Sequence, residues 1–504
     1  MAVPVYALLD ALPGGAAGPA DTRLGAWTTL HRWLVLLASS AVVSGTAAAI
    51  AIGIGLVGGI LLARSDLHAR TAFAVVVVFA ACVPVYVAVV FFLSCFPAVR
   101  LSGSAVACGV LYGLIYSPLA VLVLGAALRL ADTTLEDLAR LDAGPLTVLA
   151  RVTLPQASWG VAMLGMLVIL LVGTDITITD TLAVRTFAEE VYTQYLLDRS
   201  RCGPALTALP LLVLLGALLV GVQARYRLVG EHSATGLSRP PRCLRLGRWR
   251  GVVTAGAAGA ALLVFGWPLA ELLRHIGSLS GFASAAGPLT RELCNSALLA
   301  AAGGAAVVLP AVGLAWGLIR GGRLRFVIAA GVVVLLATPA PVVGIGLIGL
   351  LNRPGVAGSI YDLPLSVVIG YVVRFLPLGV LLLAAAVRRI PVTLEAAARL
   401  DGCDWLGIQR HIYWPNLGTD LAMVWLVIVI LCLGEIGATI LVVPPGWDTV
   451  AVRAFTLLHF GVYRDLAVLA VLSAGTILVL ALPLVWLLRR RVRQAGALPG
   501  QTGR

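Results

Sequence analysis

The sequence predicts an all-α, polytopic membrane protein with about 11 transmembrane helices in two parallel, pseudo-twofold repeats. Hydrophobic residues make up 60% of the 504 residues and charged residues only 12%, whereas soluble domains carry about 25% charged residues. Apolar runs of bilayer-spanning length, about 20 residues, recur along the chain. A polar decapeptide occurs twice, as TLEDLARLDA from Thr134 and as TLEAAARLDG from Thr393, at an offset of 259 residues.

Eleven apolar segments are expected to cross the bilayer. The expected spans are 34–64, 70–95, 104–130, 157–180, 203–225, 252–272, 293–319, 325–351, 364–388, 418–442 and 464–488. Two crossings need about 40 residues, so the first of these runs is expected to cross once. Six expected spans lie between the start of the first repeat and the start of the second repeat. Because an even number returns the chain to the same side, both decapeptides are expected to face one compartment.

The repeat divides the chain into two halves. The expected divisions are a non-spanning N-terminal segment (1–33), a first half (34–225) with a loop at 133–155, a linker (226–250), a second half (251–490) with a loop at 392–415, and a C-terminal tail (491–504). The span at 252–272 has no counterpart in the first half. Either that counterpart was lost, or the start assigned here lies downstream of the real one.

The charged residues exclude several functions. All 36 basic residues are arginines, and they give a net charge of +13. They gather in alternate loops, which is the positive-inside pattern, so we expect a cytoplasmic location for these loops and no nucleic-acid partner. A chain without lysine lacks a Walker P-loop and is not expected to hydrolyse ATP itself. Its cysteines and histidines form no CxxC or HExxH motif, so no catalytic residue, metal site or cofactor is expected.

The first decapeptide is expected to form a short surface helix. Thr133 or Thr134 can cap it, and Glu136 stands where a capping box places its carboxylate. The Ala143–Gly144 pair is expected to form a turn, and Pro155 to end the next helix.

The second decapeptide is expected to repeat this arrangement. Thr393 marks the start, Ala396 and Ala397 are strong helix formers, Gly402 breaks the helix, and Pro415 stops the next one. For one copy alone, a hairpin that merely links two spans is the simpler interpretation. Two copies on one side favour twin docking elements for a pair of identical partners.

At these residues the chain resembles the coupling loop of ABC importer permeases, with the pattern Glu-Ala-Ala, three or more residues, Gly, then Ile/Val-x-Leu-Pro. The copies read EDLARLDAGPLTVLARVTLP and EAAARLDGCDWLGIQRHIYWP. The resemblance implies a fused two-half permease of a type I ABC importer (binding-protein-dependent transport inner membrane component, MetI-like) that docks on an ABC ATPase dimer. The implied coupling residues are Glu136, Asp137, Ala139, Ala143, Gly144, Pro155, Glu395, Ala396, Ala397, Gly402 and Pro415. Leu138 and Trp414 depart from the pattern, so the two loops are expected to bind the ATPase with unequal strength.

Further segments resemble ferric-iron-type permeases, namely Thr174–Tyr195, Tyr371–Val380 and Gly434–Gly461. This resemblance implies a plasma (inner) membrane location, membrane lipid around the spans, and a periplasmic or lipid-anchored solute-binding protein as a partner. Ferric iron is the implied solute, with thiamine, phosphonate and polyamine left open. The chain itself is expected to need no cofactor.

Three charged residues lie inside or at the ends of expected spans: Asp175, Arg374 and Glu435. A charge in lipid costs at least about 2.5 kcal/mol, so each must face protein or water. Either they line a translocation path or gate, or they form structural ion pairs or snorkel at helix ends; the matching positions of the two carboxylates favour the path. The main rival function is an ion-gradient-driven secondary transporter, which would more often show inverted repeats and no docking loops. A non-transporting scaffold is the third.

Overall fold

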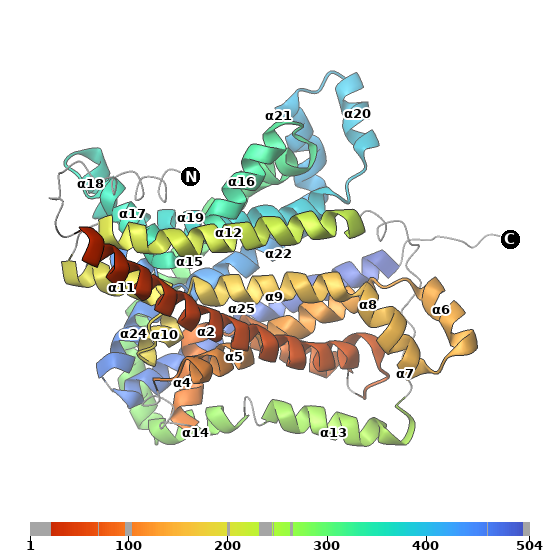
Figure 1. Cartoon of the computed structure of the whole chain (residues 1–504), viewed down its shortest axis with the longest axis horizontal. Coiled ribbons are helices and arrows are strands. Elements are labelled where there is room, and N and C mark those ends of the chain that lie inside the picture. Colours follow the sequence, from red (N-terminus) through yellow and green to blue (C-terminus); the bar gives the residue numbers. More distant parts are fainter. Residues whose placement is uncertain are drawn as a thin grey trace.

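The chain is all-helical in the computed structural model, which describes residues 22–68, 70–95, 103–198, 202–230, 244, 246–262, 266–460 and 462–496. Most of the expected N-terminal segment, most of the linker and the end of the tail therefore lie outside the described residues. Long helices lie roughly along the longest axis of the molecule, and two short helical loops, containing α6 and α20, project from the body of the bundle (Figure 1).

The first half is built on a close pair of helices, α2 and α5. A Cβ placed on Gly113 would lie 2.7 Å from the Cβ of Ile50, so the small residue allows the two backbones to approach, as is common in membranes. The elements are α2 (Thr22–Arg64), α3 (Arg70–Cys82), α4 (Val85–Cys95), α5 (Ala105–Arg129), α6 (Thr133–Asp142), α7 (Pro145–Val148), the π-helix η2 (Leu149–Thr153), α8 (Leu154–Gln156), α9 (Ser158–Gly173), α10 (Thr177–Thr181), α11 (Phe187–Asp198) and α12 (Cys202–Gly230).

The second half uses a similar close pair, α15 and α19, in which a Cβ on Gly303 would lie 2.7 Å from the ring of Tyr371. Its elements are the 3-10 helix η3 (Gly247–Trp249), α13 (Arg250–Ala261), α14 (Trp267–Ile276), α15 (Leu279–Arg320), α16 (Leu324–Ala337), α17 (Ala340–Leu351), α18 (Val356–Tyr361), α19 (Leu365–Val387), α20 (Val392–Leu400), α21 (Trp405–Ile408), the π-helix η5 (Gln409–Tyr413), α22 (Trp414–Leu433), α23 (Thr439–Val442), α24 (Val450–Phe460) and α25 (Tyr463–Gly496).

The expected count of eleven spans is too high for the described residues. They contain 6 helices long and apolar enough to cross a membrane, or up to 9 if each bent pair forms one span. The pair α3–α4 bends by 99° and the pair α16–α17 by 106°. Pro84 and Pro339 lie at these bends, where proline disfavours helix in the preceding residue. The expected span 203–225 lies within α12, a helix of 29 residues, and the expected span 252–272 contains most of α13 and the start of α14.

The helix α2 starts at Thr22. The expected N-terminal segment 1–33 therefore includes the first residues of this helix.

The bends of α3–α4 and α16–α17 pack where the halves meet. The backbone N–H of Ala340, at the start of α17, donates to the carbonyl oxygen of Thr174 at 3.3 Å. In the other half, a Cβ on Gly434 would lie 2.9 Å from the Cβ of Pro84. Each bend thus contacts the end of the helix that follows the opposite half's projecting loop.

Candidate functional site

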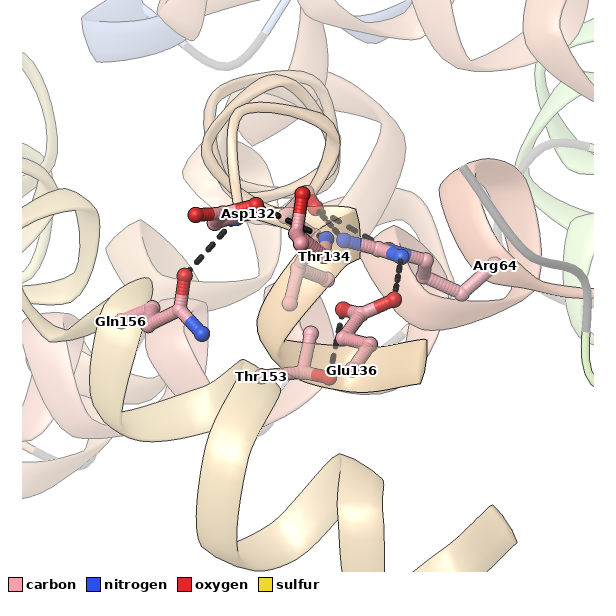
Figure 2. A network of polar contacts seen from close by, with 7 residues as sticks. Arg64, Asp132, Thr134, Glu136, Thr153 and Gln156 are labelled. Carbon is pink, nitrogen blue, oxygen red and sulfur yellow. Dashed lines mark hydrogen bonds and ion pairs between the residues drawn. The ribbon is translucent and has the colours of Figure 1, made fainter. Parts of the chain in front are cut away.

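A buried ion pair fastens the first projecting loop to the helix bundle. Nη1 of Arg64, at the end of α2, lies 2.8 Å from Oε2 of Glu136, and the hydroxyl of Thr153 donates to Oε1 at 2.8 Å (Figure 2). Nε of Arg64 donates to the carbonyl oxygen of Leu128 at 3.0 Å. Arg64 is 2% exposed and Glu136 1% exposed. The pair therefore joins α2, the end of α5, α6 and η2.

The cap of α6 differs from the expected capping box. Asp132 is the N-cap, and its Oδ1 accepts the N–H of Thr134 at 2.8 Å, while its own N–H donates to Oε1 of Gln156 at 2.8 Å (Figure 2). The prediction of Thr133 or Thr134 as the cap is wrong. The carboxylate of Glu136 turns inward to Arg64 because a buried guanidinium is a stronger partner than a backbone N–H.

The second loop is fastened in the same manner. Nε of Arg320, at the end of α15, lies 3.1 Å from Oε1 of Glu395, and the Tyr413 hydroxyl also donates to this carboxylate. Nη2 of Arg320 donates to the carbonyl oxygen of Ile390 at 2.9 Å. The helix begins at Val392 without a side-chain cap, so Thr393 is not its cap.

The two glutamates expected among the coupling residues are both buried. Glu136 and Glu395 are 1% and 3% exposed, so neither carboxylate is open to a partner protein. Each loop instead exposes large apolar side chains: Leu135, Leu138, Leu141 and Leu146 on the first, and Leu394, Leu400, Trp405 and Leu406 on the second. Leu141 is 81% exposed and Leu400 is 89% exposed. Large exposed apolar groups in such numbers are typical of an interaction surface.

The other expected coupling residues are distributed over the outside and the sides of the loops. Those that are exposed are Gly144, Pro155, Ala396, Ala397, Gly402 and Pro415; those that are half-buried are Asp137, Ala139 and Ala143.

The two glycine turns are not equivalent. Gly402 has φ +84°, a conformation that glycine adopts freely. Ala143 has φ −138° and Gly144 has φ −67°, values that any residue adopts. The Ala143–Gly144 pair therefore forms a turn that does not require glycine.

Pro155 and Pro415 do not end their helices as predicted. Each follows a π-helical turn, Leu149–Thr153 or Gln409–Tyr413, and the helix continues into α8 or α22. A proline removes one backbone hydrogen bond, and the wider π-turn accommodates this loss.

The intramembrane carboxylates are bonded within their own halves. Oε1 of Glu435 accepts the N–H of Ala438 at 2.8 Å, and Oε2 accepts the N–H of Thr439 at 2.9 Å and also its hydroxyl. Asp175 accepts the hydroxyls of Tyr112 and Thr177 at 2.8 and 2.9 Å. These bonds order the short segments that follow α22 and α9, which favours the structural interpretation of both acids.

Arg374 crosses the boundary between the halves. Its Nη2 donates to the hydroxyl of Thr174 at 2.8 Å, and its Nη1 donates to the carbonyl oxygen of Thr338 at 3.1 Å. Thr338 precedes the bend between α16 and α17, and Thr174 follows α9. Of the three charged residues expected in the path, Arg374 is the one whose hydrogen bonds join the halves.

Sequence reasoning missed the partners of the glutamates. Arg64 and Arg320 each end the first long helix of a half, directly before a loop, where an arginine is ordinarily explained by the positive-inside pattern. Their matching positions at the ends of these helices were the available signal.

Comparison with known proteins shows that part of the second half is similar to a known family. Residues 310–494 match the family model of the binding-protein-dependent transport system inner membrane component. This inner membrane component is a transport subunit and not an enzyme. The matched segment contains the second projecting loop and the helices on both sides of it. A multi-pass location in the inner membrane agrees with the bilayer-length helices of the described residues.

Curated relatives of the inner membrane component are also similar to the chain. A protein of Salmonella paratyphi A, named as the 2-aminoethylphosphonate transport system permease PhnV, is 32% identical over 108 residues, which cover 20% of this chain and 38% of the relative. The protein of the same name from Salmonella typhimurium is 31% identical over 103 residues, covering 20% and 38%. The chain thus spans less than two fifths of the length of these relatives.

Proposed function

We propose that the chain is the fused, two-half permease subunit of an ATP-driven ABC importer. The loops containing α6 and α20 dock on a separate ATPase dimer, and an external binding protein delivers the solute. The observation that carries this proposal is the pair of matching loops, each exposing leucines and each fastened to its half by a buried arginine–glutamate pair. A stiff anchor below an apolar docking surface is what a loop needs to transmit force from a partner to membrane helices.

Parallel repetition of the two halves supports two docking sites. The hydroxyl of Ser40 in α2 accepts the N–H of Phe187, the first residue of α11, at 3.1 Å. The hydroxyl of Ser296 in α15 accepts the N–H of Val450, the first residue of α24, at 2.7 Å. The near-equal bends of α3–α4 and α16–α17 are a second matching feature. We infer a pseudo-twofold relation between the halves, with both loops on the cytoplasmic side.

The boundary between the halves is the proposed translocation path. Arg374, Thr174 and Thr338 meet there through two hydrogen bonds. Alternating access requires the halves to rock against each other around such a boundary, and this motion would exchange those bonds for bonds to water or solute. Arg374 is therefore the candidate gate residue, whereas Asp175 and Glu435 stabilise the short segments that follow α9 and α22.

The names of the relatives favour a phosphonate as the solute. The chain resembles ferric-iron-type permeases in its motifs, but the curated relatives are named for 2-aminoethylphosphonate. A guanidinium at the boundary offers a group that binds a phosphonate oxygen. We propose an organophosphonate as the first solute to test, with ferric iron, thiamine and polyamine as the alternatives.

Uptake into proteoliposomes tests this function. The chain is reconstituted with its ATPase and binding protein, and radiolabelled 2-aminoethylphosphonate or ferric citrate is supplied outside. Uptake that needs both ATP and the ATPase is expected, with the phosphonate preferred. Uptake driven by an ion gradient without the ATPase would instead establish a secondary transporter.

A further inference from the structure

The segment between the halves is bonded to the end of α2. The backbone N–H of Leu244 donates to the carbonyl oxygen of Arg64, and the N–H of Asp66 donates to the carbonyl oxygen of Leu244 at 3.4 Å, which forms a parallel bridge beside Ser65. The N–H of Leu246 donates to Oδ1 of Asp66 at 2.9 Å. A chain segment far along the sequence is thus held against the residue that anchors the first projecting loop.

The Asp66 carboxylate is the side-chain part of this contact. The N–H of Leu246, and to a smaller extent the Arg250 guanidinium, hold the pKa of Asp66 below its ordinary value of 3.8. Nε of Arg250 lies 3.9 Å from Oδ2 of Asp66. The carboxylate is therefore ionised at neutral pH and accepts the Leu246 N–H as a charge-assisted hydrogen bond.

The same segment reaches the base of the first loop. Leu244 lines a small cavity together with Arg64, Glu136, Pro145 and Val148. Leu244 therefore lies across this cavity from Glu136 and the start of α7.

In the described part of the chain, no comparable segment is hydrogen-bonded beside Arg320, the anchor residue of the second loop. The backbone hydrogen bonds of Gly321, which follows Arg320, are local ones to Gly317 and Leu324. The side chain of Arg320 is 21% exposed, against 2% for Arg64. The difference in exposure agrees with a segment that lies over one anchor pair and not over the other.

We propose that Leu244 together with Leu246–Arg250 forms a clasp that stiffens the first loop, so that the two loops differ in compliance. A stiff loop would move together with the ATPase subunit that it contacts. A compliant loop would instead deform when its ATPase subunit moves. That these loops are docking sites rests on the proposed function, whereas their difference in stiffness does not.

Hydrogen exchange of the full-length chain in nanodiscs, measured by mass spectrometry, tests the clasp. Amides in 133–148 are expected to exchange more slowly than those in 392–408. Asp66→Ala removes the acceptor, and Leu246→Pro removes the donor at a residue whose φ of −72° suits proline. Each variant is expected to speed exchange in the first loop by about fivefold, as loss of about one hydrogen bond predicts, and to leave the second loop unchanged.

Asp66→Asn is the matched control, because its amide oxygen still accepts the Leu246 N–H and wild-type exchange is expected. Equal exchange of the two loops in the wild-type protein would overturn the clasp. So would an unchanged first loop in both disruptive variants, or an increase shared equally by both loops. Failure of the ATPase to bind the wild-type protein would instead count against the proposed function and leave the clasp standing.

Discussion

The guanidinium of Arg64 and the carboxylate of Glu136 form an ion pair, 2.8 Å apart, in which both side chains are 2% exposed. Burial on this scale means that the pair cannot contact a partner protein; it connects a projecting loop to the membrane helices. Removing one member of a buried pair leaves an uncompensated charge, which costs about 3–5 kcal/mol.

Arg64→Ala is therefore expected to lower the thermal stability of the purified protein markedly. Arg64→Met combined with Glu136→Gln should restore much of it, because no buried charge is left unpaired. Arg399→Ala is the control, since Arg399 is 61% exposed and lies 3.8 Å from Glu395, and such surface pairs contribute about 0–1 kcal/mol. Equal melting temperatures for Arg64→Ala and the wild-type protein would refute the anchor.

Gly402→Val and Gly144→Val make the same substitution in the turn of the second loop and in the turn of the first loop, respectively. A Cβ meets no atom within 4 Å at either position, so the comparison isolates backbone strain. At Gly402, with φ +84°, a β-branched residue costs about 1–2 kcal/mol or more; at Gly144 the cost is expected to be near zero. Gly402→Val should reduce substrate-stimulated ATP hydrolysis several-fold, and Gly144→Val should not. Equal effects at both positions would contradict the difference between the turns.

Glu435→Ala should reduce the yield of folded protein before it affects transport. The substitution removes the acceptor of the Ala438 and Thr439 N–H groups, and each unpaired buried donor costs about 1–3 kcal/mol. Asp175→Ala should behave similarly through loss of the bonds from Tyr112 and Thr177. Yield and transport rate are measured on the same preparations. A normal yield with lost transport would instead indicate that these carboxylates line the translocation path.

Single cysteines at positions 142 and 401, in a background without the native cysteines, test the parallel arrangement. Both positions are exposed near the ends of α6 and α20. A membrane-impermeant thiol reagent is expected to label them only from the cytoplasmic side. Leu197→Cys, at an 82% exposed position in α11, serves as a control that should label from outside. Labelling of 142 and 401 from opposite sides would refute the parallel repeat.

Much of the fold could be predicted from apolar runs, because length and hydropathy determine which helices suit a bilayer. The bends could not, since the runs 70–95 and 325–351 are apolar throughout while the chain turns by 99° and 106° within them. Pro84 and Pro339 were the local signals. Only packing against the opposite half, at Gly434 and Thr174, determines how the segments beyond them lie.

The projecting loops could be found from the sequence, but the direction of their side chains could not. The coupling role that the resemblance implies for Glu136 suggests a carboxylate that faces outward. Arg64 reverses this orientation, because a buried cation from another helix draws Glu136 inward and leaves Leu141 exposed. Such a partner lies far away in sequence, so periodicity within the helix does not reveal it. A Glu136→Arg variant would therefore test folding rather than docking.

The most direct test of ATPase coupling uses the exposed leucines. Leu141→Glu and Leu400→Glu, combined in one chain, place charges on both loops without touching the anchor pairs, while Leu197→Glu is the control at a similarly exposed position. Substrate-stimulated ATP hydrolysis and uptake are measured together in proteoliposomes that contain the ATPase and the binding protein. The account predicts that the double variant melts like the wild-type protein but loses at least about tenfold in both activities, as about 1.4 kcal/mol of lost docking energy would produce, and that Leu197→Glu retains them. Wild-type hydrolysis and uptake by the double variant would contradict the claim that these loops couple the ATPase to transport.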